Sequence, residues 1–458
     1  MQYQLRISGK HLEQLYQHLF PGDNKEAIAI ALCGYHLGTN STIITVHEIF
    51  NVPYVQCERN VDYIQWKTDS IIPVLEKASK KEMSIFKIHS HPMGYSRFSK
   101  QDDGSDLNFF PSMYGWTEGV QPHGSIIMLP DKKLFGRIVS LKNEFIPFDK
   151  VSIVGDAISI WNNKDCHFDK TIAKRNLQTF GEGTTKLLKS MKVGVVGASG
   201  TGSPTIEQLV RLGVGEIVIV DPDKVEKKNL NRILNTTLAD ANEGAFKVDV
   251  LTRVIEQIGF KTKVLSFNEN LYDSRDAIYE LITCDVIFGC VDSIDGRHLL
   301  NQIATFYIVP YFDLGVKLEA DEQGGINQVN GAIHYVQPGG SSLMSRRVYN
   351  SKGLEAAALL RQDPEEYDRR SKEKYIVNLP VESPAVISIN MQVSSFAVNE
   401  FLDRIHPYKG TAPRERAINW ISISEGLIFS EPDGEPDKYL EKKVGRGDVK
   451  PLLEMSEL

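Results

Sequence analysis

The chain has 458 residues, of which 41% are hydrophobic, 24% are charged and 9% are aromatic. These values are typical of globular proteins and exclude a disordered, collagen-like or coiled-coil chain. The formal net charge of −7 excludes a general electrostatic footprint for nucleic acid, and the length predicts two large domains or about three ordinary ones.

Five cysteines are spread along the chain without a C-x-x-C pair, which argues against a cysteine zinc site and a disulfide framework. A low, odd number of cysteines suits a reducing compartment. The first residues lack the apolar core of a signal peptide, and no apolar run approaches the roughly 18 residues of a membrane span. We therefore expect a soluble, cytoplasmic protein that does not bind membranes.

Strand-like and helix-like segments alternate along the chain and predict an α/β fold. We expect a first domain over residues 1–160, a second over 161–407, and a tail over 408–458 whose role the sequence leaves open. The polar stretch 162–165 marks the first boundary. Apolar patterning in the first domain predicts a helix over 11–20 and strands over 27–33, 42–50, 85–91 and 125–129.

The strand predicted over 85–91 ends in the sequence His89-Ser90-His91. Side chains two residues apart on a strand share a face, so both imidazoles point the same way. Seven residues separate His91 from Ser99, and the stretch from Ser99 to Asp102 is typical of a helix start. Two imidazoles and one carboxylate leave a fourth position open for water, as in catalytic zinc sites.

Peptide hydrolysis at such a site also needs a proton shuttle and a group that stabilises the developing oxyanion. Glu26, directly before the apolar run 27–33, is the candidate for the first role, and the Ser99 hydroxyl is the candidate for the second. The nearby Asp103 and Asp106 are expected to be solvated charges on the helix surface.

Together, these residues resemble the motif of the JAMM (JAB/MPN) metalloprotease family over about residues 10–130. The resemblance implies an α/β metalloprotease domain that cleaves peptide or isopeptide bonds after the C-termini of ubiquitin-like proteins. It implies zinc ligation by His89, His91 and Asp102, acid–base catalysis by Glu26 and oxyanion support by Ser99. The alternative is an inactive scaffold with the same fold.

A second pattern begins with the apolar run 192–196, which predicts a buried strand. Ser203 suits the N-cap and Pro204 the first position of a helix that ends near residue 212. The free backbone N–H groups at such a helix start can hold phosphate. Between the strand and the helix lies a glycine-rich turn, which contains Gly197, Gly200 and Gly202.

The next strand is predicted over 216–220 and closes at Asp221, where a carboxylate can hold ribose hydroxyls. Ser199 stands where the dinucleotide-binding pattern has its central glycine, and an NAD-dependent dehydrogenase is the alternative interpretation. Side chains that suit the triphosphate of ATP follow, namely Asn229, Arg232 and Lys247. They favour nucleotide-triphosphate chemistry over hydride transfer.

Asp292 follows another apolar run, and an acid at the end of a strand suits Mg²⁺ that bridges phosphates. These segments resemble the ThiF/MoeB family, the adenylating core of ubiquitin-activating enzymes, over about residues 170–405. The resemblance implies a Rossmann-like, doubly wound domain that uses MgATP to adenylate the C-terminal glycine of a ubiquitin-like protein. It implies ATP binding by the turn glycines Gly197, Gly200 and Gly202 and by Asp221, Asn229, Arg232 and Lys247, with Mg²⁺ on Asp292.

Arg175 matches the arginine that dimers of this family insert into the partner's active site, which implies a homodimer. No cysteine occurs after Cys290, so a thioester on the crossover loop cannot form and the zinc ligands of many relatives are missing. Three routes for the adenylate remain: transfer to the cysteine of a conjugating enzyme, an oxyester on Ser341 or Ser342, or direct attack by an amine.

The sequence therefore predicts two activities that meet at one object, the C-terminus of a ubiquitin-like protein. The leading hypothesis is a bifunctional activating and processing or deconjugating enzyme of a bacterial-type pathway, which uses zinc, ATP and magnesium. One alternative is an adenylating enzyme of sulfur transfer or peptide modification with an associated peptidase. Another is a non-catalytic scaffold that binds a ubiquitin-like protein.

Overall fold

The computed structural model describes residues 1–117, 119, 121–163, 166–321, 323–372 and 385–458. The chain divides into two compact units, each built from several segments. The first unit contains residues 1–164, 306–308 and 442–456, and the second contains residues 165–305, 309–441 and 457–458. Lys164 and Asp165, which belong to the expected boundary stretch, lie outside the described residues. The segment 408–458 is thus shared between the two units.

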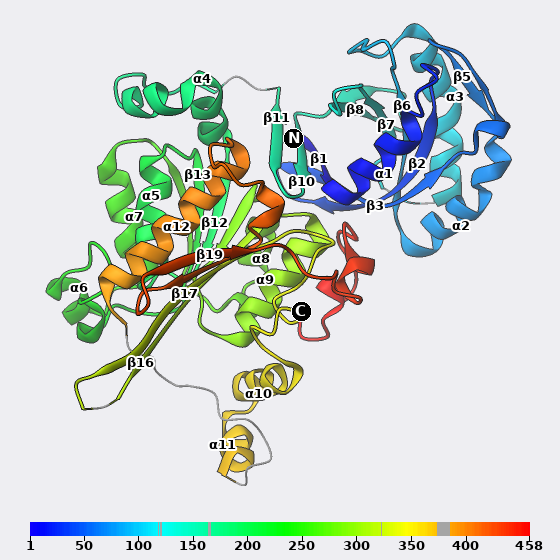
Figure 1. Cartoon of the computed structure of the whole chain (residues 1–458). Coiled ribbons are helices and arrows are strands. Elements are labelled where there is room, and N and C mark those ends of the chain that lie inside the picture. The colour runs from blue at the N-terminus through cyan, green and yellow to red at the C-terminus, as the bar shows by residue number, and fades with distance from the viewer. Residues whose placement is uncertain (118, 120, 164–165, 322, 373–384) are drawn as a thin grey trace. The chain divides into compact units, whose positions relative to one another are not determined.

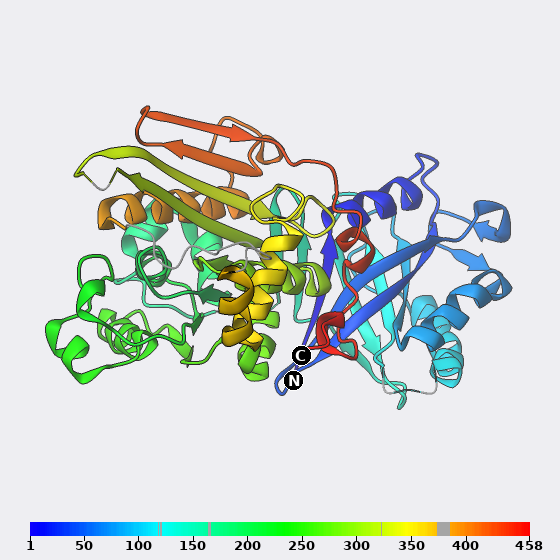
Figure 2. The same ribbon diagram turned by 90° about the horizontal axis from the view of Figure 1, so that it is seen from below.

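The first unit is a nine-stranded sheet with helices on both faces (Figures 1 and 2). The strand order is β11-β10-β1-β3-β2-β6-β7-β8-β9. The helices are α1 (Gly9–Leu19), α2 (Ile72–Lys81) and α3 (Lys100–Thr117). The strands of the sheet are β1 (Gln2–Ser8), β2 (Ile28–Leu37), β3 (Ser41–Asn51), β6 (Ser84–Ser90), β7 (Gly124–Met128), β8 (Leu134–Val139), β9 (Phe145–Pro147), β10 (Lys150–Val154) and β11 (Ile158–Asn162), and a separate hairpin is formed by β4 (Cys57–Arg59) and β5 (Ile64–Trp66).

Strand β2 explains why this sheet is buried on both faces. Its alternate residues point to opposite sides of the sheet, so Ala29 and Ala31 join the core under α1, whereas Ile28 and Ile30 join the core under α2 and α3. A strand covered on both faces is apolar at nearly every position. The uninterrupted apolar run seen in the sequence has this cause.

The segment 442–456 is an integral part of the first unit. The N–H of Gly34 on β2 donates to the carbonyl oxygen of Gly445 at 3.2 Å. Further along, the Asp448 carboxylate lies 3.0 Å from Nδ1 of His36 and accepts the hydroxyl of Tyr307 at 2.7 Å. His36 and Tyr307 are buried, so this carboxylate satisfies two polar groups that water does not reach.

We expect the substitution Asp448→Ala to weaken the first unit locally, because it leaves the His36 ring and the Tyr307 hydroxyl without this partner. Loss of a hydrogen bond to a charged group costs about 1.5–3 kcal/mol. Native-state hydrogen exchange of the amides of β2 and β3 measures the effect as a corresponding drop in opening free energy. Asp131→Ala removes an exposed carboxylate of the same unit and serves as the control; equal protection in both variants would contradict the prediction.

The second unit is an eight-stranded sheet in the order β14-β13-β12-β15-β16-β17-β18-β19. The strands from β14 to β16 are parallel and those from β16 to β19 are antiparallel neighbours (Figure 2). The strands are β12 (Lys192–Val196), β13 (Glu216–Val220), β14 (Lys263–Phe267), β15 (Val286–Gly289), β16 (Tyr311–Ala320), β17 (Ile326–Val336), β18 (Ile418–Ser422) and β19 (Leu427–Glu431). The helices are α4 (Lys174–Ser190), α5 (Gly202–Arg211), α6 (Leu238–Glu243), α7 (Lys247–Ile258), α8 (Arg275–Ile282), α9 (Ile294–Tyr307), α10 (Ser351–Gln362), α11 (Pro364–Lys372) and α12 (Ile387–Ile405).

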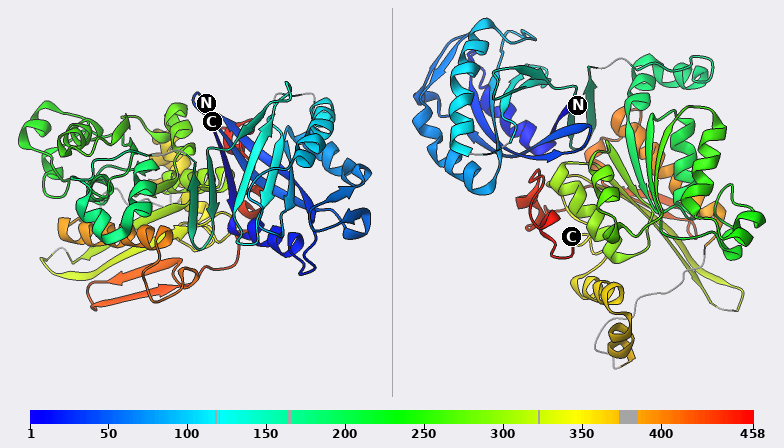
Figure 3. Two further views of the ribbon diagram at one scale, coloured as in Figure 1. Left: turned by 90° about the horizontal axis from the view of Figure 1, so that it is seen from above. Right: turned by 180° about the vertical axis from the view of Figure 1, so that it is seen from behind.

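The strand order of this sheet extends from β12 in two opposite directions. The path β12-β13-β14 moves toward one edge, and the path β15-β16 then moves toward the other. Because crossovers between parallel strands are right-handed, α5 and α7 cover one face and α8 and α9 the other (Figures 1 and 3). The neighbouring strands β12 and β15 therefore form a topological switch point, where ligands of doubly wound folds bind beyond the carboxyl ends of the strands. The expected fold class is confirmed.

Most predicted elements occur at or near the predicted positions. The strands over 192–196 and 216–220 are found with those bounds, and the segment 408–458 contains β18 and β19. The predicted cap of α5 is wrong, because the N-cap is Thr201 and the helix begins at Gly202. Ser203 lies inside the helix, where its hydroxyl accepts the N–H of Leu234 at 3.1 Å. Within the described ranges, no helix combines the length and apolar character that a membrane span requires.

Candidate active sites

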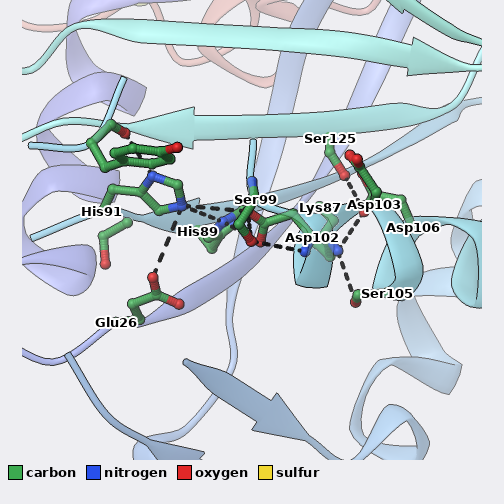
Figure 4. Close-up of polar contacts among 12 residues, drawn as sticks. Glu26, Lys87, His89, His91, Ser99, Asp102, Asp103, Ser105, Asp106 and Ser125 are labelled. Atoms are coloured by element: carbon green, nitrogen blue, oxygen red, sulfur yellow. Dashed lines mark hydrogen bonds and ion pairs between the residues drawn. The ribbon is translucent and has the colours of Figure 1, made fainter. Parts of the chain in front are cut away.

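Strand β6 and helix α3 bring the three predicted zinc ligands together (Figure 4). His89 lies on β6, His91 follows its end, and Asp102 lies in the first turn of α3. The Nε2 atoms of the two histidines are 3.1 Å apart, and Oδ1 of Asp102 is 3.1 Å from Nε2 of His89. The three donor atoms lie within 4.8 Å of one another, and two imidazoles with one carboxylate fit a catalytic zinc ion.

Neighbouring groups orient these side chains. Nδ1 of His91 lies 2.7 Å from the carbonyl oxygen of Tyr95, and a proton on Nδ1 leaves Nε2 with the lone pair that a metal needs. Asp102 Oδ2 accepts the N–H and the hydroxyl of Ser99, both at 2.7 Å. Although burial raises it, the pKa of Asp102 is held well below its usual range by hydrogen bonds from His89 and His91. Asp102 is therefore ionised.

Ser99 occupies the helix start that the sequence predicts. Its hydroxyl accepts the N–H of Asp102 at 3.1 Å while the carboxylate accepts from Ser99, which is a reciprocal cap. The hydroxyl proton of Ser99 points to Asp102 in this arrangement. The geometry supports an orienting role for Ser99, and contact with an oxyanion requires the hydroxyl to rotate.

Glu26 lies two residues before the start of β2 and is 6% exposed. Its Oε1 is 3.9 Å from Nε2 of His91. Burial raises the pKa of Glu26 to about 7, His91 opposes this rise, and the Asp102 charge adds to it. A carboxyl group that titrates near neutral pH suits proton transfer to and from a reacting group.

A cavity of about 730 Å³ opens beside these residues. Glu26, His89 and Asp102 line one part of it. Its other walls come from the β4–β5 hairpin, α2 and α3 and include the aromatic side chains of Trp66, Phe109 and Trp116. The cavity gives a peptide segment room next to the candidate metal ligands.

The expectation that Asp106 is a solvated surface charge is wrong. Its side chain is fully buried, and Lys87 Nζ lies 2.5 Å from its Oδ1. Asp103 is 41% exposed, yet it pairs with Arg137 at 2.6 Å. The helix pattern did not reveal this because Lys87 and Arg137 come from two different strands of the sheet.

In the second unit, the glycine-rich turn follows β12 and passes against the segment after β15. A Cβ atom on Gly197 would lie 2.4 Å from the carbonyl oxygen of Cys290, and the φ of +92° there favours glycine. A Cβ atom on Gly200 would lie 2.3 Å from Nδ2 of Asn390 on α12. Asn390 was not singled out in the sequence, because only the fold brings α12 to the turn.

Asp221 directly follows β13 and is hydrogen-bonded to the glycine-rich turn. Its Oδ2 accepts the N–H of Ala198 at 2.6 Å, and its Oδ1 accepts the N–H of Asp223 at 2.9 Å. The Nζ of Lys247 lies 3.4 Å from Asp221 and 2.6 Å from Asp223. Burial raises the pKa of Asp221, and the Lys247 charge opposes this rise. The structure thus brings the glycine-rich turn, Asp221 and Lys247 together at the carboxyl ends of β12 and β13.

The other predicted ATP-site residues have these surroundings. Asn229 is buried, and its side-chain oxygen accepts the N–H of Glu226 at 2.9 Å. Arg232 donates to the carbonyl oxygen of Lys228 at 3.0 Å, and its Cδ would lie 3.5 Å from a Cβ on Gly200. Asp292 is exposed between β15 and α9. Arg175 is exposed on α4 and bonds within that helix, to Gln178 at 2.9 Å.

Ser341 and Ser342, the candidate oxyester nucleophiles, are 3% and 2% exposed. The Ser341 hydroxyl donates to Asp433 and accepts Nε–H of Arg346 at 2.7 Å. The Ser342 hydroxyl donates to Asp437 at 2.5 Å. Both hydroxyls therefore hold this loop against the segment 433–437.

These features define a two-part protein, with a doubly wound unit whose glycine-rich turn lies at the switch point and an α/β unit with a His–His–Asp cluster. Residues 173–424 match the model of the ThiF family, and residues 8–126 match that of the prokaryotic homologs of the JAB domain. The first match spans more than half of the chain, and the chain belongs to the ThiF family, with a JAB domain fused at its N-terminal side.

Curated relatives include the ubiquitin-like modifier-activating enzyme 5 of Aedes aegypti, 29% identical over 163 residues, which cover 33% of this chain and 38% of the relative. The enzyme of the same name from Bombyx mori is 28% identical over 165 residues, covering 34% and 39%. The chain thus spans about two fifths of the length of these relatives. Solved structures with similarity include E. coli MccB with ATP, with 16% identity, a TM-score of 0.43 and coverage of 58% of this chain and 73% of that one.

Proposed function

We propose that this chain is a bifunctional enzyme that acts on the C-terminus of a ubiquitin-like protein in a bacterial-type pathway. The second unit uses ATP and Mg²⁺ to adenylate the terminal glycine, and the first unit hydrolyses a peptide or isopeptide bond that follows it. The observation that carries this proposal is that a His–His–Asp cluster with a buried glutamate and a ThiF-family unit with a glycine-rich turn occur in one chain. The names of the curated relatives support the same substrate class.

In the proposed hydrolysis, the residues of the first unit have separate roles. His89, His91 and Asp102 would hold zinc, which polarises a carbonyl and acidifies water when bound. Glu26, 3.9 Å from His91, takes the proton of the attacking water and delivers it to the leaving amine. Ser99 keeps Asp102 oriented through two hydrogen bonds and reaches the oxyanion when its hydroxyl rotates.

In the proposed adenylation, the phosphates of ATP bind at the turn at the N-terminus of α5, where backbone N–H groups and the helix dipole favour anions. Asp221 binds the ribose side of the nucleotide, Arg232 and Lys247 neutralise phosphate charge, and Asp292 would hold Mg²⁺. Asn229 positions this segment through its buried cap. Arg175, exposed on α4, reaches the site of the partner subunit in a homodimer.

The adenylate passes directly to the cysteine of a conjugating enzyme. No cysteine follows Cys290 in the sequence. Ser341 and Ser342 are 3% and 2% exposed, and this burial disfavours attack by either hydroxyl and hence an oxyester. Direct attack on the adenylate by a free amine is the alternative to this transfer.

Gly197→Ala is expected to weaken ATP binding about ten- to hundredfold, because a Cβ atom collides with the Cys290 carbonyl and the positive φ is strained. Titration calorimetry with ATP measures the dissociation constant. Gly183→Ala, where a Cβ meets no atom within 4 Å, is the matched control. Equal ATP affinities for the two variants would refute the assignment of this turn.

Pyrophosphate exchange into ATP tests the first activity. We expect exchange only when a ubiquitin-like protein with a free terminal glycine is added, and exchange with a short peptide instead would favour peptide modification. Cleavage of a ubiquitin-like protein fused to a C-terminal peptide tests the second activity, with chelator treatment and zinc restoration as the control. Absence of both activities, with binding retained, would favour the scaffold alternative.

A further inference from the structure

Two pairs of side chains bridge strand β6 and helix α3 in the first unit. His89 Nε2 lies 3.1 Å from Asp102 Oδ1, and Lys87 Nζ lies 2.5 Å from Asp106 Oδ1. Lys87 precedes His89 by two strand residues, which is about 6.6 Å. Asp106 follows Asp102 by four helix residues, which is about 6 Å. The two bridges therefore match in spacing, and α3 runs antiparallel to β6.

The second bridge is part of a larger buried network (Figure 4). Asp106 Oδ1 also accepts the hydroxyl of Ser125 on β7 at 2.7 Å, and its Oδ2 accepts Nη2–H of Arg137 on β8 at 2.7 Å. One carboxylate thus ties α3 to three neighbouring strands. The Asp106 side chain is 0% exposed and that of Lys87 is 5% exposed, so a shift of α3 would leave buried charges unpaired, which is strongly unfavourable.

We infer that Lys87 and Asp106 are positioning residues that set the distance between His89 and Asp102 and thereby the affinity of the site for zinc. The inference rests on the proposed zinc site. A functional constellation has to be held within about 0.5 Å, and groups that support metal ligands typically change metal affinity by about ten- to hundredfold when they are removed. Ser99 orients Asp102 at the start of the helix, and the Lys87–Asp106 bridge fixes the helix one turn further on.

The substitution Lys87→Met tests this inference, because it keeps an unbranched side chain and removes the ammonium group. Zinc affinity is measured by competition with a chromophoric chelator, and the visible absorption of the Co²⁺-loaded protein reports the ligand geometry. We expect the zinc dissociation constant to rise about ten- to hundredfold and the Co²⁺ bands to change. Wild-type affinity with a wild-type Co²⁺ spectrum would overturn the inference.

Leu15→Ala, in the core under α1, destabilises the same unit without touching the network. It is expected to retain wild-type zinc affinity, and a loss equal to that of Lys87→Met would also overturn the inference. If circular dichroism shows that Lys87→Met does not fold, Ser125→Ala tests the inference instead, because Ser125 donates to Asp106. We expect its zinc affinity to be several-fold weaker, and an unchanged zinc affinity would overturn the inference. A wild-type protein that binds no zinc would refute the proposed site itself.

Discussion

Replacing Asp292 with alanine is expected to abolish adenylation and to leave hydrolysis by the first unit unchanged. Asp292 follows β15 at the switch point, and the same segment contacts the glycine-rich turn, where the Cys290 carbonyl meets Gly197. Without this carboxylate, the proposed Mg²⁺ loses its protein ligand and the developing pyrophosphate charge is not neutralised. We expect pyrophosphate exchange to fall by about a thousandfold or more.

Asp368→Ala removes an exposed acid on α11 and controls for the change of one surface charge. Its pyrophosphate exchange should equal that of the wild type. Exchange at wild-type rate in Asp292→Ala would contradict the Mg²⁺ assignment. Loss of peptide hydrolysis in the same variant would contradict the independence of the two sites.

The substitution Glu26→Gln is expected to stop hydrolysis while zinc stays bound. The amide is nearly isosteric, and the backbone bonds of Glu26, from its N–H to Asn60 and from Arg59 to its carbonyl oxygen, do not involve the side chain. Loss of a proton-transfer group lowers the rate by about 10²- to 10⁴-fold. Cleavage of a ubiquitin-like fusion protein measures the rate, and atomic absorption measures the zinc content.

Glu58→Gln changes an exposed glutamate on the neighbouring hairpin and should retain full activity. Two outcomes would count against the assignment of Glu26. Persistent cleavage in Glu26→Gln would exclude it from the proton transfer, and loss of zinc would show that it acts as a ligand instead.

Local patterns predicted the elements that support both sites. The apolar runs of β12 and β13 are buried strands because both faces of the sheet are covered. The His-x-His spacing placed His89 and His91 on one face at the end of β6, and the Ser99 cap placed Asp102 at the start of α3, since period-two strands and helix starts have strong local signals. Their meeting in one cluster was implied by the resemblance to the JAMM motif.

The missed features depend on contacts between segments far apart in the sequence. Serine is a common N-cap residue, but the hydroxyl of Ser203 accepts the N–H of Leu234 instead. The helix pattern alone predicts that Asp106 is a surface acid, whereas its partners Lys87 and Arg137 come from strands of the sheet. The sequence places Asp448 in a polar tail, whereas in the structure its carboxylate lies beside His36. Pairing of this kind has no local periodicity from which it can be predicted.

One measurement tests directly whether the two units act on the same terminus. A ubiquitin-like protein extended by a short peptide beyond its terminal glycine is incubated with MgATP and the enzyme, and its intact mass is recorded under denaturing conditions. The account predicts that the wild type trims the extension and then adds one adenylyl group, that Asp292→Ala only trims, and that Glu26→Gln does neither. Adenylation of the precursor by Glu26→Gln, or an unchanged precursor mass with the wild type, would contradict it.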